Sequence, residues 1–195
     1  HVVARRSHVL AVALAEVLLH VVEQFEAFLS PFPSDVVVVA EVLDRLVRAS
    51  DGGVRSLEGV RALMLYPLNA LISSQEERLS LWFEPFGGAL RYCLYNGETP
   101  EAARKSTARD RPWRVGDRTT LRASPPPVLV TNVTMLEYML IRQKDAPILR
   151  ASQGTLDFVV LDEAHSYVGA QAAEIALLLR RVALAFGRRP EELRY

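Results

Sequence analysis

Two adjacent carboxylates, Asp162 and Glu163, follow the apolar run Phe158–Leu161. Such a run is typical of a strand buried on both faces, and ligands bind beyond the carboxyl ends of strands in open α/β sheets. Neighbouring residues of an extended chain point to opposite sides, so each carboxylate can address a different atom. In nucleoside triphosphate hydrolysis the two tasks are holding hydrated magnesium, which suits Asp162, and orienting water, which suits Glu163. Taken alone, the pair is also compatible with a solvated turn.

The elements that must position this pair are short apolar runs that alternate with longer segments of helical period. This alternation predicts an α/β fold with a doubly wound parallel sheet flanked by helices. The predicted strands are Ala62–Tyr66, Leu90–Tyr95, Val128–Thr131 and Phe158–Asp162. The predicted helices are Leu68–Trp82, Met135–Arg142 and Gly169–Phe186. Thr134 and Glu137 stand at the spacing of a capping box for the second helix.

The loops after three of these strands contain groups suited to a phosphate backbone. A helix start offers unpaired N–H groups and the positive end of its dipole, and a glycine lets the backbone approach closely. The residues in these loops are Pro67, Leu68, Asn69, Asn96, Gly97, Thr131 and Asn132. Together they would form a track that binds nucleic acid without reading its sequence. For each loop alone, ordinary helix capping is the alternative.

The ordered set of strand-end sequences resembles the motifs of superfamily 2 DEAD/DEAH-box helicases. Asp162-Glu163-Ala164-His165 matches the DEAH form of motif II. Ala62–Leu71, with Gln75 one turn on, looks like motif Ia, and Val128–Leu136 resembles motif Ib. Tyr95–Thr99 is similar to the glycine-containing loop between those two motifs. The resemblance is to the first RecA-like domain of large bacterial DEAH-box helicases of the repair and phage-defence type.

The resemblance, which covers about Val42 to Tyr195, implies a P-loop NTPase fold with ATP and Mg²⁺ as cofactors. It implies that Asp162 holds the metal through water, that Glu163 is catalytic, and that His165 links the triphosphate site to neighbouring motifs by hydrogen bonding. The implied partners are a nucleic-acid backbone, with DNA placed ahead of RNA, and a second RecA-like domain that this chain lacks. Metal ligation by His165 is disfavoured because no cysteine or second histidine lies nearby.

The family's phosphate-binding loop, Gly-x-x-x-x-Gly-Lys-Thr/Ser, is not recognisable. The only lysines, Lys105 and Lys144, both follow the motif Ia segment, and the first glycine is Gly52. If Glu41–Arg48 is the helix that normally follows the loop, then Ser30–Asp35 occupies its place, with two prolines that lack amide donors and an aspartate that repels phosphate. We therefore expect tight triphosphate binding to be lost and the isolated chain to be inactive.

Composition and charge set the remaining expectations. The 195 residues carry no formal net charge, so any nucleic-acid contact must come from local placement of polar groups. Cys93 is the only cysteine, which excludes an internal disulfide and a cysteine-based zinc site and favours a reducing cytoplasm. Residues 1–35 are predicted to be an N-terminal helical segment, amphipathic or buried rather than membrane-spanning. Residues 36–195 are predicted to form the partial RecA-like domain, with a surface insertion at about 99–127.

Three functions remain open at this point. The first is a fragment or altered copy of an ATP-dependent helicase, cut from something longer because the chain begins with His1 rather than methionine. The second is a non-catalytic RecA-like module that binds nucleic acid or a protein. The third is a magnesium-dependent nuclease, which is weaker because a further carboxylate and a lysine near Asp162 and Glu163 are not evident.

Overall fold

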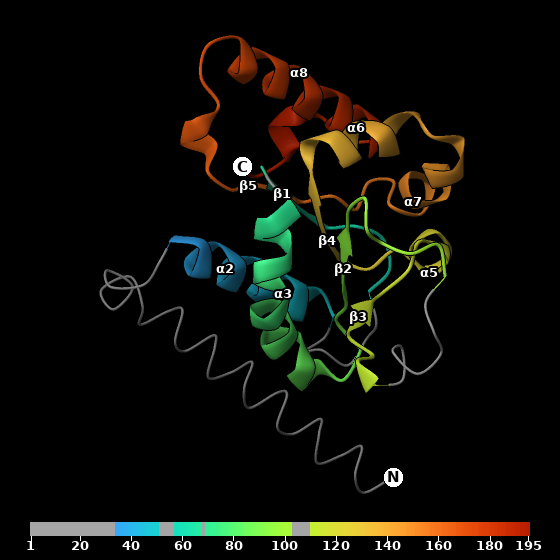
Figure 1. Ribbon diagram of the computed structural model, residues 1–195. Coiled ribbons are helices and arrows are strands. Elements are labelled where there is room, and N and C mark those ends of the chain that lie inside the picture. The colour runs from blue at the N-terminus through green and yellow to red at the C-terminus, as the bar shows by residue number, and fades with distance from the viewer. Residues whose placement is uncertain (1–33, 51–56, 68, 103–109) are drawn as a thin grey trace, which may run out of the picture.

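The structure is a computed structural model that describes residues 34–50, 57–67, 69–102 and 110–195 (Figure 1). The helices are α2 (Ser34–Ala49), α3 (Asn69–Phe83), α5 (Arg118–Ala123), α6 (Val133–Ile141), α7 (Ala146–Ala151) and α8 (Ala170–Ala185). The strands are β1 (Ala62–Tyr66), β2 (Tyr92–Tyr95), β3 (Arg114–Val115), β4 (Val128–Asn132) and β5 (Phe158–Leu161). Short 3-10 turns are η1 (Glu84–Phe86), η2 (Gln143–Asp145), η3 (Ala164–Ser166) and η4 (Pro190–Glu192).

The five strands form one parallel sheet in the order β3-β2-β4-β1-β5. The central strand β1 pairs with β4 on one side and β5 on the other, so Ala62 lies opposite both Val128 and Phe158. Every residue of β1 is buried, as a strand covered on both faces requires. The predicted RecA-like α/β architecture is confirmed, and the four predicted strands agree with β1, β2, β4 and β5 to within two residues at each end.

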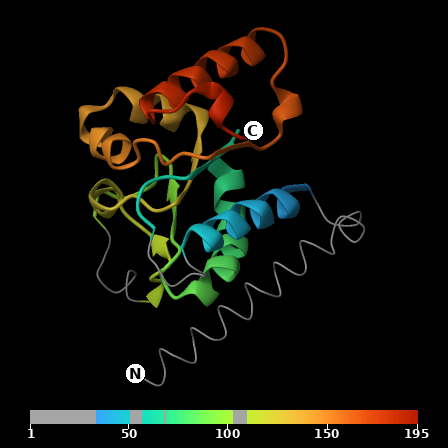
Figure 2. The same ribbon diagram turned by 180° about the vertical axis from the view of Figure 1, so that it is seen from behind.

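Two layers of helices cover the sheet. The first core cluster joins α2 and α3 to one face, to which Met64 of β1 contributes. The second joins α5, α6, α7 and α8 to the other face, to which Leu63 and Leu65 contribute. Figure 1 and the reverse view in Figure 2 show α2 and α3 together on one side of the strands and α6, α7 and α8 on the other. The alternation of side chains along β1 thus supplies both cores.

The run Val36–Val39, compatible with a strand or a helix, lies within helix α2. Buried apolar residues recur along α2 at the 3.6-residue period of a helix. They are Val39, Val42, Leu43, Leu46 and Val47. Of the segment expected in place of the phosphate loop, Ser34 and Asp35 begin α2. Residues 30–33 and the rest of the predicted N-terminal helical segment lie outside the described residues.

The stretch at about 99–127, expected to be a surface insertion, contributes to the sheet and its cover. Arg114 and Val115 form the edge strand β3, paired in parallel with β2. Asp117 caps helix α5, because its side chain accepts a 2.8 Å hydrogen bond from the Thr120 N–H, and Leu121 of the helix is fully buried. This part of the segment is therefore integrated with the domain. Among the described residues, no helix is long and apolar enough to cross a membrane.

Because the thiol of Cys93 is buried, the free energy of unfolding should decrease as the pH rises above 9. Burial raises the pKa of Cys93 from 9.0 to about 12, so above pH 9 the unfolded chain loses a proton that the folded chain keeps. Wild-type stability should therefore fall relative to Cys93→Ala by up to ~1.4 kcal/mol per pH unit above 9. Urea unfolding of both proteins from pH 8 to pH 11 checks this, and a constant difference between them would contradict it.

Candidate functional site

Strand β5 delivers Asp162 and Glu163 to the edge of the sheet. The Asp162 N–H donates a 2.9 Å hydrogen bond to the Leu65 carbonyl, which extends the pairing with β1 by one residue. The chain then turns at Glu163, where φ is 52° and ψ is 36°. Glu163 is the only non-glycine among the described residues with a positive φ. A left-handed backbone at a candidate catalytic carboxylate is the kind of strain that functional sites retain.

Glu163 and His165 contact each other in solvent. The distance from His165 Nε2 to Glu163 Oε2 is 3.2 Å, and the side chains are 81% and 51% exposed. A side-chain contact this exposed contributes little to stability. The contact orients the two side chains toward each other. Because both are exposed, both remain accessible to a bound molecule.

Tyr167 lies near the carboxylate pair, and the sequence did not single it out. Burial and, after it, the negative charge of Asp162 raise the pKa of Tyr167. Its hydroxyl oxygen is buried and has no hydrogen-bond partner within the described part of the chain. The only available sequence signal was an aromatic residue two positions after His165. The structure thus places an unused donor close enough to Asp162 to interact with its charge.

The strand register brings the predicted loops to the same edge as the carboxylates. Leu65 lies opposite both Thr131 and Leu161, and Tyr95 also lies opposite Thr131. The residues that follow these positions therefore leave the sheet together. We call this edge, formed by Tyr66–Pro67, Asn96–Gly97, Thr131–Asn132 and Asp162–Glu163, the strand-end rim. The common placement is observed, whereas the binding roles of these residues stay predictions.

Three predicted nucleic-acid contacts use their side chains to hold the rim. Thr131 is fully buried and its hydroxyl donates a 2.6 Å hydrogen bond to the Tyr95 carbonyl. Asn96 is 6% exposed, and its Oδ1 accepts hydrogen bonds from the Glu98 N–H at 3.0 Å and the Thr99 hydroxyl at 3.2 Å. These side chains position the loops, so contact with a ligand would fall to exposed Gly97 and to main-chain groups.

Asn132, the third of these predicted nucleic-acid contacts, caps helix α6. Its Oδ1 accepts a 2.7 Å hydrogen bond from the Met135 N–H, and α6 begins directly afterwards at Val133. The predicted capping box of Thr134 and Glu137 is therefore wrong, because β4 extends to Asn132 and leaves this side chain at the cap position. Glu137 instead lies 3.9 Å from Arg181 of α8.

Two predicted contacts precede helix α3. Pro67 is partly buried at the end of β1, and α3 starts at Asn69. Leu68 and the side chain of Asn69 lie outside the described part of the structure. The helix starts where the sequence places it, within one residue.

The donor set at the rim fits a hydrated magnesium ion better than an ion held by protein alone. Within 34–50, 57–67, 69–102 and 110–195, no three His, Cys, Asp or Glu side chains gather as a metal site. Mg²⁺ commonly takes one or two protein carboxylates and fills its octahedron with water and substrate phosphate. Asp162 is the residue here that could supply one such carboxylate.

Comparison with known proteins identifies the family. A model described as DEAD/DEAH box helicase matches residues 36–193, most of the chain. The chain belongs to the DEAD/DEAH box helicase family. It is also 26% identical over 217 residues to Druantia protein DruE of Escherichia coli (strain UMEA 4076-1), a match that covers 65% of this chain and 12% of DruE.

Solved structures support the fold. The chain matches the DUF1998 helicase MrfA with a TM-score of 0.54 and 22% identity, covering 78% of this chain and 21% of MrfA. It matches MrfA bound to DNA with a TM-score of 0.54 and 21% identity, covering 80% and 19% of the two chains. This helicase-family chain therefore spans about an eighth of the length of DruE and about a fifth of MrfA and shares the MrfA fold.

The left-handed turn at Glu163 predicts an unusual order of stability among variants. Because a Cβ disfavours this conformation, Glu163→Gly should be more stable than Glu163→Ala by about 1 kcal/mol. Urea unfolding of the two variants measures the difference, and Glu163→Gln, which keeps the Cβ, should behave as Glu163→Ala does. An alanine variant as stable as the glycine variant would show that the turn stores no strain.

Proposed function

We propose that this chain is the first RecA-like domain of an ATP-dependent nucleic-acid helicase, and that the isolated chain binds nucleic acid without hydrolysing ATP. The strand-end rim is the observation on which this depends. It brings the loops after β1, β2 and β4 to the edge where β5 presents Asp162 and Glu163. The family match and a MrfA structure bound to DNA and AMPPNP support the proposal.

Nucleic acid would bind along the rim through its phosphates. Helix α6 begins at the rim directly after Asn132, so the positive end of its dipole lies there, and Gly97 is exposed in the loop after β2. Contacts of this kind position a strand without reading bases, so binding should weaken steeply with salt. We propose DNA ahead of RNA as the partner, and a second RecA-like domain as the element that completes the site.

The carboxylates would divide the chemistry of ATP hydrolysis. Asp162 would hold Mg²⁺ through water, and the ion would stabilise charge on the phosphates when bound. Glu163 would orient the attacking water and accept its proton. His165, 3.2 Å from Glu163, would fix the direction of that carboxylate. The buried hydroxyl of Tyr167 would be available to donate a hydrogen bond near Asp162.

The absence of a glycine-lysine pair before β1 favours a second candidate, the non-catalytic module. Lys144 lies in η2 after helix α6, and Lys105 also follows β1. Neither lysine occupies the position that the family uses for the outer phosphates. The two candidates share nucleic-acid binding and differ in triphosphate binding.

Triphosphate binding separates the candidates. Isothermal titration of the chain with magnesium and ATP should show no binding in the micromolar range, because no lysine precedes β1 to pair with the phosphates. Glu163→Gln serves as a control that removes the hydrolytic carboxylate and preserves any bound ATP. A micromolar isotherm for either protein would show that another segment has replaced the missing loop.

Nucleic-acid binding at the rim can be tested at Asn132. Asn132→Asp keeps an acceptor at the cap of α6 and adds a negative charge at the rim. A unit charge about 4 Å from a phosphate contributes roughly 1 kcal/mol in water, so single-stranded DNA should bind on the order of fivefold more weakly. Fluorescence anisotropy measures the affinity and thermal unfolding confirms the fold. Equal affinity for wild type and a stably folded Asn132→Asp would contradict the proposed binding edge.

A further inference from the structure

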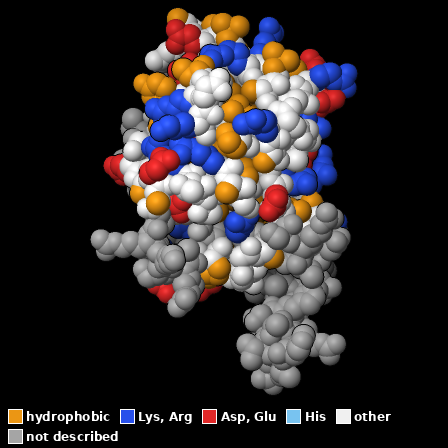
Figure 3. Space-filling view, turned by 90° about the vertical axis from the view of Figure 1, so that its right-hand side faces the viewer, with side chains coloured by type: hydrophobic (Ala, Val, Ile, Leu, Met, Phe, Trp, Pro, Cys, Tyr) orange, Lys and Arg blue, Asp and Glu red, His pale blue; other side chains and the backbone are white. Residues whose placement is uncertain are grey.

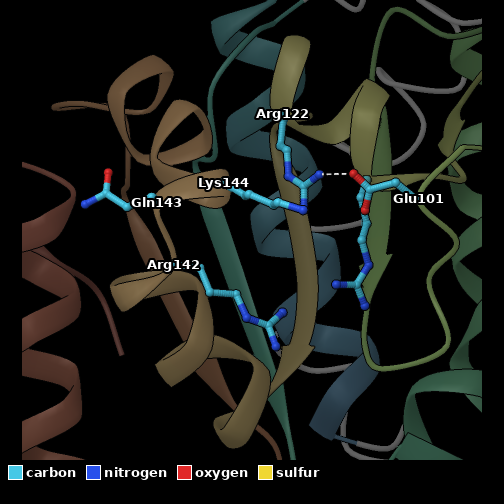
Figure 4. A pocket seen from close by; sticks show the side chains of 6 residues that line it. Glu101, Arg122, Arg142, Gln143 and Lys144 are labelled. Carbon is cyan, nitrogen blue, oxygen red and sulfur yellow. Dashed lines mark hydrogen bonds and ion pairs between the residues drawn. The ribbon is translucent and has the colours of Figure 1, made fainter.

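A basic pocket lies beside the rim, on the side of the sheet covered by α5 and α7. Its volume is about 390 Å³. The residues that line it are Glu101, Arg118, Arg122, Arg142, Gln143 and Lys144. Figure 4 shows that these side chains come from α5, from the end of α6 and η2, and from the segment after β2. Glu101, Arg122 and Lys144 point toward one another, and Gln143 points away from them. Figure 3 shows Lys and Arg side chains gathering on this side of the molecule.

A buried carboxylate fixes one wall of the pocket. Asp145 is fully buried and accepts hydrogen bonds from Arg122 Nε at 2.9 Å and from the Tyr95 hydroxyl at 2.8 Å. Burial, together with this hydrogen bond, raises the pKa of Tyr95 to about 12, so the hydroxyl remains a donor at neutral pH. The pair holds η2 against α5 and β2. Arg122 therefore has a structural role, and its Nη1 group pairs with Glu101.

The other three cations of the pocket have no carboxylate partner among the described residues. Arg118 and Lys144 form no ion pair there, and Arg142 lies over the ring of Tyr138 with its guanidinium carbon 4.5 Å from the ring centre. Because Asp145 and Glu101 both pair with Arg122, the pocket has an excess of two positive charges. Cationic side chains without a carboxylate partner are suited to an oxyanion, and arginine in particular to phosphate.

Arg118 connects the pocket to the rim. Its guanidinium donates hydrogen bonds to the Thr99 carbonyl at 2.8 Å and to the Asn96 carbonyl at 3.1 Å, and so holds the loop after β2. It also lies over the Tyr95 ring, 5.3 Å from the centre. The same side chain thus lines the pocket and supports a loop of the rim. A strand that crosses the rim at Gly97 would reach the pocket next.

We propose that this pocket binds a phosphate group of the nucleic-acid strand as it leaves the strand-end rim, an inference that rests on the proposed function. The volume equals on the order of a dozen water molecules, at about 30 Å³ each, and is large enough for a phosphate with its neighbouring sugar. Arg142 and Lys144 provide the charge. Arg122 and Asp145 keep the wall in place.

The test is to remove the charges of Arg142 and Lys144 and to measure the affinity of the chain for single-stranded DNA. Arg142→Gln with Lys144→Gln should bind an oligonucleotide of about 16 nucleotides roughly five- to tenfold more weakly than wild type, measured by fluorescence anisotropy. The slope of log affinity against log salt should become shallower by about 0.7 for each phosphate that the variant no longer neutralises. The control is Arg45→Gln, an exposed cation on α2 across the sheet, which should bind as wild type does.

Thermal unfolding identifies any loss of fold, and Lys144→Gln alone repeats the test at an exposed position if the double variant is unstable. An added 5′-phosphate separates the two sources of the ligand. If it tightens wild-type binding and not that of the double variant, the pocket holds a strand end; if it changes neither, the pocket holds an internal phosphodiester.

The outcomes distinguish this inference from the proposed function. If wild type binds DNA, Asn132→Asp binds weakly and the pocket variant binds as wild type does, the pocket inference is overturned and the rim stands. If wild type binds no single-stranded DNA at low salt, the proposed function is overturned together with the pocket.

Discussion

Parallel pairing around β1 is the constraint on which the site depends. Because β1 pairs with both β4 and β5 in register, their carboxyl ends must leave the sheet at one edge, and β2 joins them through β4. The pairing is possible because apolar side chains on both faces of β1 are covered by helices. Polar residues that lie far apart in the sequence are thereby gathered at one edge of the sheet.

The sequence predicted the elements that are long and apolar, and it missed those that are short and charged. The strands β1, β4 and β5 are visible in the sequence as largely apolar runs, whereas β3 has two residues, one of them an arginine. Helix α5, with two arginines in six residues and a single buried leucine, gives no periodic signal. The valine run before Glu41 was ambiguous because β-branched residues favour strands locally, and packing of the helical stripe of α2 decided the outcome.

At the site, the sequence predicted positions better than roles. The rim contains the residues expected there, yet Thr131, Asn96 and Asn132 bond to the protein's own backbone. Such assignments depend on which groups the register places within hydrogen-bonding distance, and no pattern of residue types encodes that distance. The pocket was missed for a related reason, because its cations come from separate segments and the overall charge is zero.

Helix α6 has a mechanical consequence for the domain. It begins at Val133, directly after the last residue of β4, and ends at Ile141, directly before Arg142 of the pocket. Nine residues, about 14 Å of helix, therefore join the rim to the pocket. Its buried face, with Met135, Leu136 and Met139, restricts bending. If a nucleic-acid strand binds at the rim and at the pocket, the two contacts lie at opposite ends of α6. A displacement of one end of this helix would then move the other end as part of the same rigid body.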